Sequence, residues 1–315
     1  MDIWPVIRIV AFEFAGGDAF FLGLALLVTG GLAAVWRDGA RVRACFRLAT
    51  ICSCLVIAAS GTPLPLWFYG IGLSLIAVSL LPRPPALANV RARRRFRVVV
   101  LLLASWCAAG AVWEFSYRLP PRLDDTIHYD ALVVIGDSVR AGVLGSTEWT
   151  WPKEFRKRHG VRVEDLSAEG ATARLALSQA RSLNEYGKNF RAVVVIEIGG
   201  NDYFELVPPA DFESDLDRLL TTLATPDRRI IMLETPLPPF YNDYGRVERE
   251  LATRHRVPLI SKREFARVLF TSGATLDTVH LSEKGHGLFA DMVWQQVGSL
   301  LRAHSVRQQD SGAEG

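Results

Sequence analysis

Residues 131–138 read Ala-Leu-Val-Val-Ile-Gly-Asp-Ser, and this stretch decides how the second half of the chain is interpreted. Its apolar run over residues 132–135 predicts a buried β-strand, which Gly136 and Asp137 end with a tight turn. Ser138 follows that turn, at the carboxyl end of the strand. In open α/β sheets this edge is where ligands bind, so Ser138 is a candidate nucleophile. It also needs a base, an acid to orient the base, and oxyanion donors.

Strand-like and helix-like segments alternate on both sides of this stretch. Continuous Val, Ile and Leu runs are typical of a parallel sheet that is covered on both faces. We therefore expect a flavodoxin-like three-layer α/β/α domain over residues 129–303, with a mainly parallel five-stranded sheet. The predicted strands cover residues 131–135, 161–166, 192–198, 229–233 and 257–260, and the predicted helices lie near 151–158, 171–186, 210–223, 246–255 and 282–302. A stiff polar linker is expected at 119–128, and a disordered polar tail at 304–315.

The first 118 residues predict a membrane domain. A helix needs about 20 apolar residues to cross the hydrocarbon core. Four apolar runs are that long or nearly so, and they cover about residues 19–36, 47–60, 64–81 and 98–115. Residues 3–14 predict an interfacial helix or the start of a longer first span. They lack the basic start of a cleavable signal peptide.

Arginine placement predicts the orientation of these spans. Residues 1–127 carry 13 Arg and no Lys against seven acidic residues, so the basic excess lies in the apolar half and indicates a membrane flank, with no nucleic-acid partner. The clusters follow the first run and separate the third from the fourth: Arg37, Arg41, Arg43, Arg47, Arg83, Arg91, Arg93, Arg94, Arg95 and Arg97. Both loops are therefore expected in the cytoplasm. The chain is predicted to be a multi-pass inner-membrane protein whose second half lies on the periplasmic or extracellular side.

A candidate base and its orienting acid occur together near the end of the second half. Residues 277–286 read Asp-Thr-Val-His-Leu-Ser-Glu-Lys-Gly-His. Asp277 and His280 are three residues apart and face the same side of a turn, so Asp277 can bind one imidazole nitrogen and leave the other for Ser138. A single Asp-x-x-His is more often a surface capping pair. His286 is the competing base, but it lies inside the following helix, where local packing is expected.

Candidate oxyanion donors follow two other strands. Residues 195–202 read Val-Ile-Glu-Ile-Gly-Gly-Asn-Asp, which places Asn201 at a strand end, with Gly200 and Asp202 as supporting residues. The Asn201 amide can donate to an oxyanion, and Asp202 can brace the loop. Gly170 follows the second strand and offers a backbone N–H at a helix start. An ordinary turn is the alternative for each of these segments when it is considered alone.

Together these motifs resemble the SGNH family of GDSL-type hydrolases over about residues 129–303. The resemblance implies an ester, thioester or O-acetyl substrate, with Ser138 as nucleophile, His280 as base and Asp277 as its orienter. It also implies an oxyanion hole made by the N–H groups of Ser138 and Gly170 and the side chain of Asn201. Val139 replaces the leucine of the family name, and the second block carries Asp165 and Ser167 where Asn and Gly are common.

No cofactor or metal is expected. The four cysteines, Cys45, Cys52, Cys54 and Cys107, all lie within or beside the apolar runs, and none is spaced as a redox or zinc pair. They are predicted to be small lipid-facing or helix-facing residues. The second half of the chain therefore needs no disulfide.

The predicted function is an extracytoplasmic, membrane-anchored serine esterase acting on a small-molecule, lipid or glycan ester. Aromatic loops at residues 148–151 and 235–241 could border its acyl pocket, although core packing explains them equally well. One alternative is an O-acyltransferase or deacetylase that modifies envelope glycans with the same triad, because only the exclusion of water separates the two reactions. The other is a non-catalytic, membrane-tethered binding module. The oligomeric state is not predicted.

Overall fold

The computed structural model of the chain describes residues 3–36, 39–81, 90–137, 150–186, 190–277 and 280–301. It divides into two compact units. One comprises Met1–Leu119 with Pro236–Arg246, and the other comprises Pro120–Thr235 with Val247–Gly315. The candidate nucleophile Ser138, its neighbour Val139 and the predicted disordered tail at 304–315 lie outside the described residues.

The second unit is built on a parallel five-stranded sheet, as the sequence predicts. The strands are β1 (Ala131–Gly136), β2 (Arg162–Asp165), β3 (Ala192–Glu197), β4 (Arg228–Leu233) and β5 (Leu259–Ile260). Their order is β2-β1-β3-β4-β5, and every neighbouring pair is parallel. This is the flavodoxin-like order, in which successive connections diverge between β1 and β3. The crevice for a ligand is therefore expected at the carboxyl ends of these two strands.

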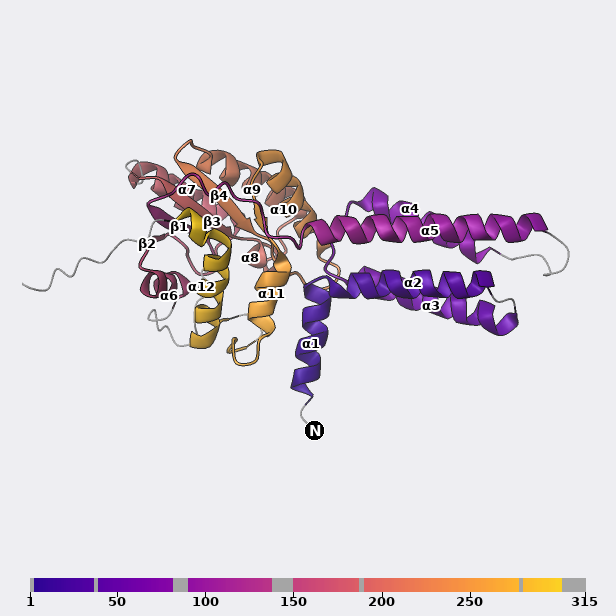
Figure 1. The fold of residues 1–315 in the computed structure, drawn as a ribbon. Helices are drawn as coiled ribbons and strands as arrows, with labels where there is room; N and C mark the ends of the chain where they lie inside the picture. Colours follow the sequence, from indigo (N-terminus) through magenta and orange to yellow (C-terminus); the bar gives the residue numbers. More distant parts are fainter. Residues whose placement is uncertain are drawn as a thin grey trace, which may run out of the picture. The chain divides into compact units, whose positions relative to one another are not determined.

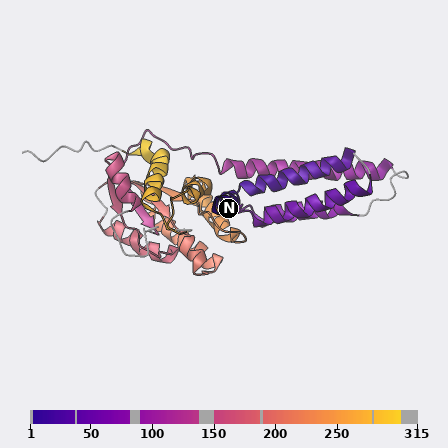
Figure 2. The same ribbon diagram turned by 90° about the horizontal axis from the view of Figure 1, so that it is seen from below.

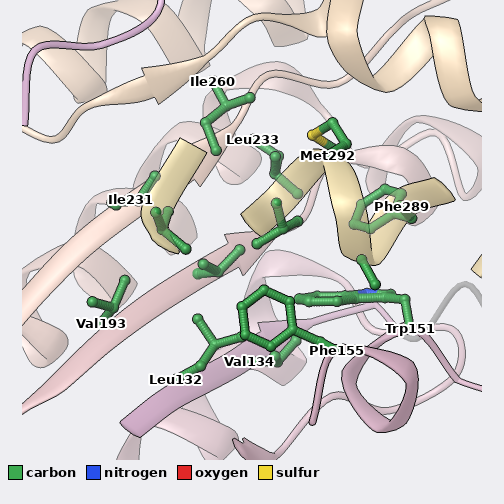
Figure 3. Close-up of a cluster of buried hydrophobic side chains, with 14 of the residues drawn as sticks. Leu132, Val134, Trp151, Phe155, Val193, Ile231, Leu233, Ile260, Phe289 and Met292 are labelled. Atoms are coloured by element: carbon green, nitrogen blue, oxygen red, sulfur yellow. The ribbon is translucent and has the colours of Figure 1, made fainter. Parts of the chain in front are cut away.

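Burial on both faces explains why the strands are continuous apolar runs. All six residues of both β1 and β3 are buried. Leu132 and Val134 of β1 join a core with α6 (Trp151–His159), α11 (Lys262–Phe270) and α12 (Glu283–Val297), which cover one face of the sheet (Figures 1 and 3). The other face is covered by α7 (Ala173–Tyr186), α9 (Pro209–Leu223) and α10 (Asn242–His255).

Helix boundaries differ from the prediction in several places. The helix α10 begins four residues earlier than predicted, and the last helix ends at Val297 before a 3₁₀ turn over Gly298–Leu300. Two helices were not predicted, namely α11 and the short α8 (Gly200–Phe204). The helix α11 directly follows a strand of only two residues, and the Ser261 hydroxyl caps it by accepting the Arg263 N–H at 3.2 Å.

The described residues of the first unit form the helices α1 (Trp4–Ala15), α2 (Asp18–Trp36), α3 (Ala40–Ala59), α4 (Leu66–Leu80) and α5 (Val90–Ser116). Among the described residues, three helices are long and apolar enough to cross a membrane: α2, α3 and the part of α5 from Arg93 to Ser116. Of the four predicted spans, the third is the short one, because α4 has only 15 residues. The second is longer than predicted because α3 begins at Ala40 instead of residue 47.

These helices pack against one another through aromatic and apolar side chains. Figures 1 and 2 show α2, α3, α4 and α5 running alongside one another. The Trp106 ring stacks on Phe68 with 4.7 Å between ring centroids, and its indole N–H donates to the Phe68 carbonyl at 3.0 Å. At the end of this bundle, the Arg118 guanidinium donates to Asp18 at 2.5 Å. These contacts join α4 to α5, and α2 to the segment that follows α5.

The segment Pro236–Arg246 belongs to this first unit, although it follows β4 in the chain. The Asn242 side-chain amide donates to the Ser60 carbonyl at 2.9 Å. A Cβ added at Gly61 would lie 3.2 Å from the Leu237 carbonyl oxygen, so the two backbones approach closely there. The loop predicted at 235–241 therefore packs mainly against the turn between α3 and α4.

Candidate active site

The turn after β1 requires glycine. Gly136 has a φ of +124°, and a Cβ added there would lie 1.9 Å from the Glu197 carbonyl oxygen. That carbonyl accepts the Asp137 N–H at 2.8 Å, so the end of β1 is held against the end of β3. The chain leaves β1 in a fixed direction just before Ser138.

A glutamine that the sequence analysis did not identify also holds this turn. The Gln179 side chain lies on α7 and is buried. Its oxygen accepts the Gly136 N–H at 2.7 Å, and its nitrogen donates to the Gly136 carbonyl at 3.1 Å. Gln179 satisfies both backbone polar groups of the residue at which the strand turns. Its distance of 43 residues from Gly136 in the chain leaves no local sequence signal for the contact.

The Asp137 carboxylate is hydrogen-bonded to two of the predicted oxyanion donors, Gly170 and Asn201. It accepts the Gly170 N–H at 3.1 Å and a hydrogen bond from the Asn201 side chain. Burial raises the pKa of Asp137, whereas these hydrogen bonds and the nearby charge of His280 lower it. Gly170 has a φ of +73°, a conformation that favours glycine. Asn201 also donates to the Ala171 carbonyl at a longer distance of 3.3 Å.

The loop that carries Asn201 is held to the start of α7 by the Asp202 side chain. Gly200 begins α8, and the Asp202 side chain accepts the Ala173 N–H through both oxygens at 3.1 Å. Burial raises the pKa of Asp202 to about 6, so it is mostly ionised at pH 7 and caps the first turn of α7. Glu197 is buried beside the turn, and burial together with the Asp137 charge raises its pKa well above the ordinary range.

Asp277 and His280 form the predicted pair. The Asp277 Oδ2 lies 2.6 Å from His280 Nδ1, and Asp277 Oδ1 accepts the His280 backbone N–H at 2.8 Å. The two side chains are 48% and 45% exposed, so the ring is open to a substrate. One carboxylate therefore orients both the backbone and the ring of His280, and it leaves Nε2 free of this contact.

The loop before α12 presents this pair. The Leu276 N–H donates to the His280 carbonyl at 2.8 Å and closes a tight loop around the two side chains. Ser282 then caps α12, because its hydroxyl accepts the Gly285 N–H at 3.2 Å and donates to the Gly273 carbonyl at 2.6 Å.

His286, the competing base, lies in the interior of the domain. It is 0% exposed, and neither ring nitrogen has a hydrogen-bond partner among the described residues. Burial lowers the pKa of His286 to about 4, with the Glu154 charge opposing the shift. Trp151, at the end of the other predicted pocket loop, is also in the core, where it packs on Phe289 (Figure 3). Neither side chain faces a substrate.

The burial of His286 predicts acid sensitivity. Its folded pKa of about 4 is below the unfolded value of 6.5, so its contribution to stability is present above pH 6.5 and lost as the pH falls toward 4. The full loss is on the order of 3 kcal/mol. We expect His286→Leu to reduce the fall in Tm of the full chain in detergent between neutral pH and pH 5. The exposed His128, changed to leucine, is the control and should leave that fall unchanged.

The structure thus brings together Asp137, Gly170 and Asn201 at the strand ends, and it pairs Asp277 with His280. Across the described ranges, no group of three or more His, Cys, Asp or Glu side chains could hold a metal ion.

Known proteins are similar in sequence to this chain. Residues 134–288 match the GDSL-like Lipase/Acylhydrolase family. The chain is 28% identical over 139 residues to Esterase TesA of Pseudomonas aeruginosa, a match that covers 41% of this chain and 68% of that protein. It is 23% identical over 183 residues to Thioesterase 1/protease 1/lysophospholipase L1 of Escherichia coli K12, covering 56% and 87%.

Solved structures with similar folds include a crystal structure of TesA, with 26% identity, a TM-score of 0.47 and coverage of 54% of this chain and 99% of that one. The esterase EstA from Pseudoalteromonas sp. is 18% identical, with a TM-score of 0.48 and coverage of 54% and 97%. By the family-model match, residues 134–288 belong to the GDSL-like lipase/acylhydrolase family, and the chain carries a serine hydrolase domain of that family.

Proposed function

We propose that the protein is a membrane-anchored esterase in which Ser138 is the nucleophile, His280 the general base and Asp277 the residue that orients it. The observation that carries this proposal is the 2.6 Å contact between Asp277 Oδ2 and His280 Nδ1, which pairs the expected base with the acid that orients it. A base, its orienter and a serine are the groups that nucleophilic ester cleavage needs.

In the proposed reaction, the Ser138 hydroxyl attacks the ester carbonyl carbon and passes its proton to His280 Nε2. The carbonyl oxygen becomes an oxyanion, which Asn201 and the backbone N–H groups of Ser138 and Gly170 stabilise. Collapse expels the alcohol, which takes the proton from His280. Water, activated by the same base, then releases the acid from the acyl-enzyme. Asp277 stays ionised and stabilises the imidazolium.

The membrane part of the proposal is supported by the first unit. Three helices have the length and composition of spans, and their outward residues include exposed leucines such as Leu48, Leu55 and Leu101. Most of the clustered arginines lie in the first eight residues of α3 and of α5, next to the connections from α2 to α3 and from α4 to α5. By the positive-inside rule these ends of the helices are cytoplasmic, so we infer that the hydrolase domain is on the opposite side of the inner membrane.

The substrate class is proposed to be an acyl ester available outside the cytoplasm, such as a lipid ester or an acylated envelope glycan. Two relatives are named an esterase and a thioesterase 1/protease 1/lysophospholipase L1, and esterases, thioesterases and lysophospholipases cleave an acyl group from oxygen or sulfur. The proposed triad and oxyanion donors all act on the acyl carbonyl group, so they do not restrict which alcohol or thiol leaves.

A membrane-impermeant phosphonate probe tests the proposal, because it forms a stable adduct only with an activated serine. The full chain is expressed in a Gram-negative bacterium, and spheroplasts are treated intact or after lysis. We expect labelling in intact spheroplasts, with the adduct on the peptide that contains Ser138 and with loss of hydrolysis of a short acyl ester. Heat-denatured protein should not react.

The outcomes separate the two parts of the proposal. An adduct at another residue, or hydrolysis that survives complete labelling, would contradict the role of Ser138. Labelling at Ser138 that needs lysis would leave the chemistry in place but reverse the orientation.

A further inference from the structure

A buried carboxyl group lies behind the loop that carries Asn201, and the mechanism above does not use it. Glu248 is on α10 and is 0% exposed. Its Oε2 accepts the Thr235 N–H at 3.0 Å, and its Oε1 lies 2.6 Å from the Thr235 hydroxyl oxygen. The same hydroxyl oxygen lies 2.9 Å from the Ile198 carbonyl oxygen. Thr235 follows β4 and Ile198 follows β3, so these bonds join two neighbouring strand ends.

Counting protons shows which form of Glu248 this arrangement requires. A threonine hydroxyl has one hydrogen, and a backbone carbonyl can only accept. The Thr235 hydroxyl must therefore donate to Ile198, and the short contact with Glu248 then needs a proton from the carboxyl group. An ionised Glu248 would leave either that contact or the Ile198 carbonyl without a hydrogen. Both bonds form only when Glu248 is a neutral acid.

The charged groups around Glu248 agree with this protonation state. Glu234 at the end of β4 is buried and already bonded to Arg249 of α10 at 2.7 Å and to Lys262 of α11 at 3.4 Å. Burial and the Glu234 charge raise the pKa of Glu248 to about 8, against the opposing effects of the Thr235 hydrogen bonds and the Lys262 charge. From α9, the Phe212 ring lies close to Gly199: its Cζ would be 3.5 Å from a Cβ added at that glycine.

The hydrogen-bonded pair Glu248–Thr235 is in contact with the backbone that leads to Asn201. Gly199 has a φ of +118°, and a Cβ added there would lie 2.8 Å from Glu248 Oε1 and 3.0 Å from Thr235 Oγ1. Gly199 comes directly after Ile198 and two residues before Asn201. A shift of the Glu248–Thr235 pair would therefore move the start of α8, where Asn201 lies.

We infer that Glu248, in its protonated form, is a positioning residue for the oxyanion donor Asn201. This inference rests on the proposed function. Ionisation of Glu248 would remove one hydrogen bond of the pair, place a second buried negative charge beside Glu234, and loosen the backbone before Asn201. Because that loss affects stabilisation of the transition state, kcat should fall while KM changes little.

The test compares Glu248→Gln with Glu248→Ala in the full chain in detergent, using a nitrophenyl butyrate ester from about pH 6 to about pH 10. Glutamine reproduces the neutral acid, because its oxygen can accept the Thr235 N–H and its nitrogen can donate to the hydroxyl. We expect the parent kcat to fall as the pH rises through about 8, and Glu248→Gln to keep the kcat of neutral pH while losing that fall. Glu248→Ala should lose about tenfold in kcat at every pH.

Two further measurements make the result decisive. Glu250→Gln, an exposed position on the same helix, is the matched control and should keep the parent profile. An infrared difference spectrum between parent and Glu248→Gln at pH 7 should show the carbonyl band of a carboxylic acid. An active parent whose alkaline fall persists in Glu248→Gln, or a carboxylate band at pH 7, would overturn the inference alone. A parent that hydrolyses no ester would overturn the proposed function, and the inference with it.

Discussion

The Asp277→Asn variant is expected to hydrolyse an ester with a kcat about 10⁴-fold below that of the parent protein. Both oxygens of Asp277 are used, one by the His280 ring at 2.6 Å and one by the His280 backbone N–H at 2.8 Å. Asparagine has one acceptor oxygen, so it can serve only one of these two donors. If the amide nitrogen faces the ring, it donates to Nδ1 and moves the imidazole proton to Nε2, where a base must be unprotonated.

The same substitution should leave the fold intact. The pair is about half exposed, and its removal creates no cavity and leaves no buried charge. We therefore expect a Tm within a few degrees of the parent. Asp291→Asn is the matched control, since Asp291 is also a partly exposed acid and its carboxylate is bonded to Arg158 outside the site. A kcat for Asp277→Asn within tenfold of the parent would contradict the orienting role.

The sheet could be predicted from sequence because its central strands are uninterrupted apolar runs. β1 and β3 are buried on both faces, which favours Val, Ile and Leu along the middle of each strand and makes both strands recognisable in the sequence. The strand-end residues Asp137, Gly170 and Asn201 follow from the same logic, because parallel strands end at one edge. Asp277 and His280 are three residues apart, so their contact is local and visible in the chain.

The contacts that hold the site in place could not be predicted in this way. Gln179 binds the Gly136 backbone across 43 residues, and Glu248 reaches Thr235 from the next helix. These are single polar side chains whose partners are backbone groups, and backbone groups carry no sequence signature. The helix α11 was missed because only two strand residues precede it, too few to separate a strand from a helix by periodicity.

The boundary between the two units is also hard to predict from the sequence. Residues 236–246 lie between β4 and α10 in the chain, and a linear division of the sequence assigns them to the hydrolase domain. Their packing against Ser60 and Gly61 assigns them to the unit of apolar helices instead. Composition indicates which segments are apolar, but it does not indicate which loop closes against which turn.

The Asn201→Ala variant is expected to lose about 10² to 10³-fold in kcat, the usual cost of removing one oxyanion donor. In the structure the Asn201 amide donates to Asp137 and, at 3.3 Å, to the Ala171 carbonyl. The second bond is long, so a developing oxyanion can replace it at little cost, while the bond to Asp137 keeps the amide oriented. The gain is realised only when the carbonyl oxygen becomes charged, so KM should change little.

The division between kcat and KM is what identifies the role. Asn184→Ala serves as the control. The Asn184 side chain also forms two hydrogen bonds, accepting from the Arg228 guanidinium and donating to the Thr222 carbonyl, but it lies away from the catalytic strand ends. Asn184→Ala should lower Tm and leave kcat within about twofold of the parent. Asn201→Ala should lower kcat and leave Tm nearly unchanged. If Asn201→Ala instead raises KM at constant kcat, the amide binds the ester in its ground state, and the oxyanion must then be stabilised by backbone N–H groups alone.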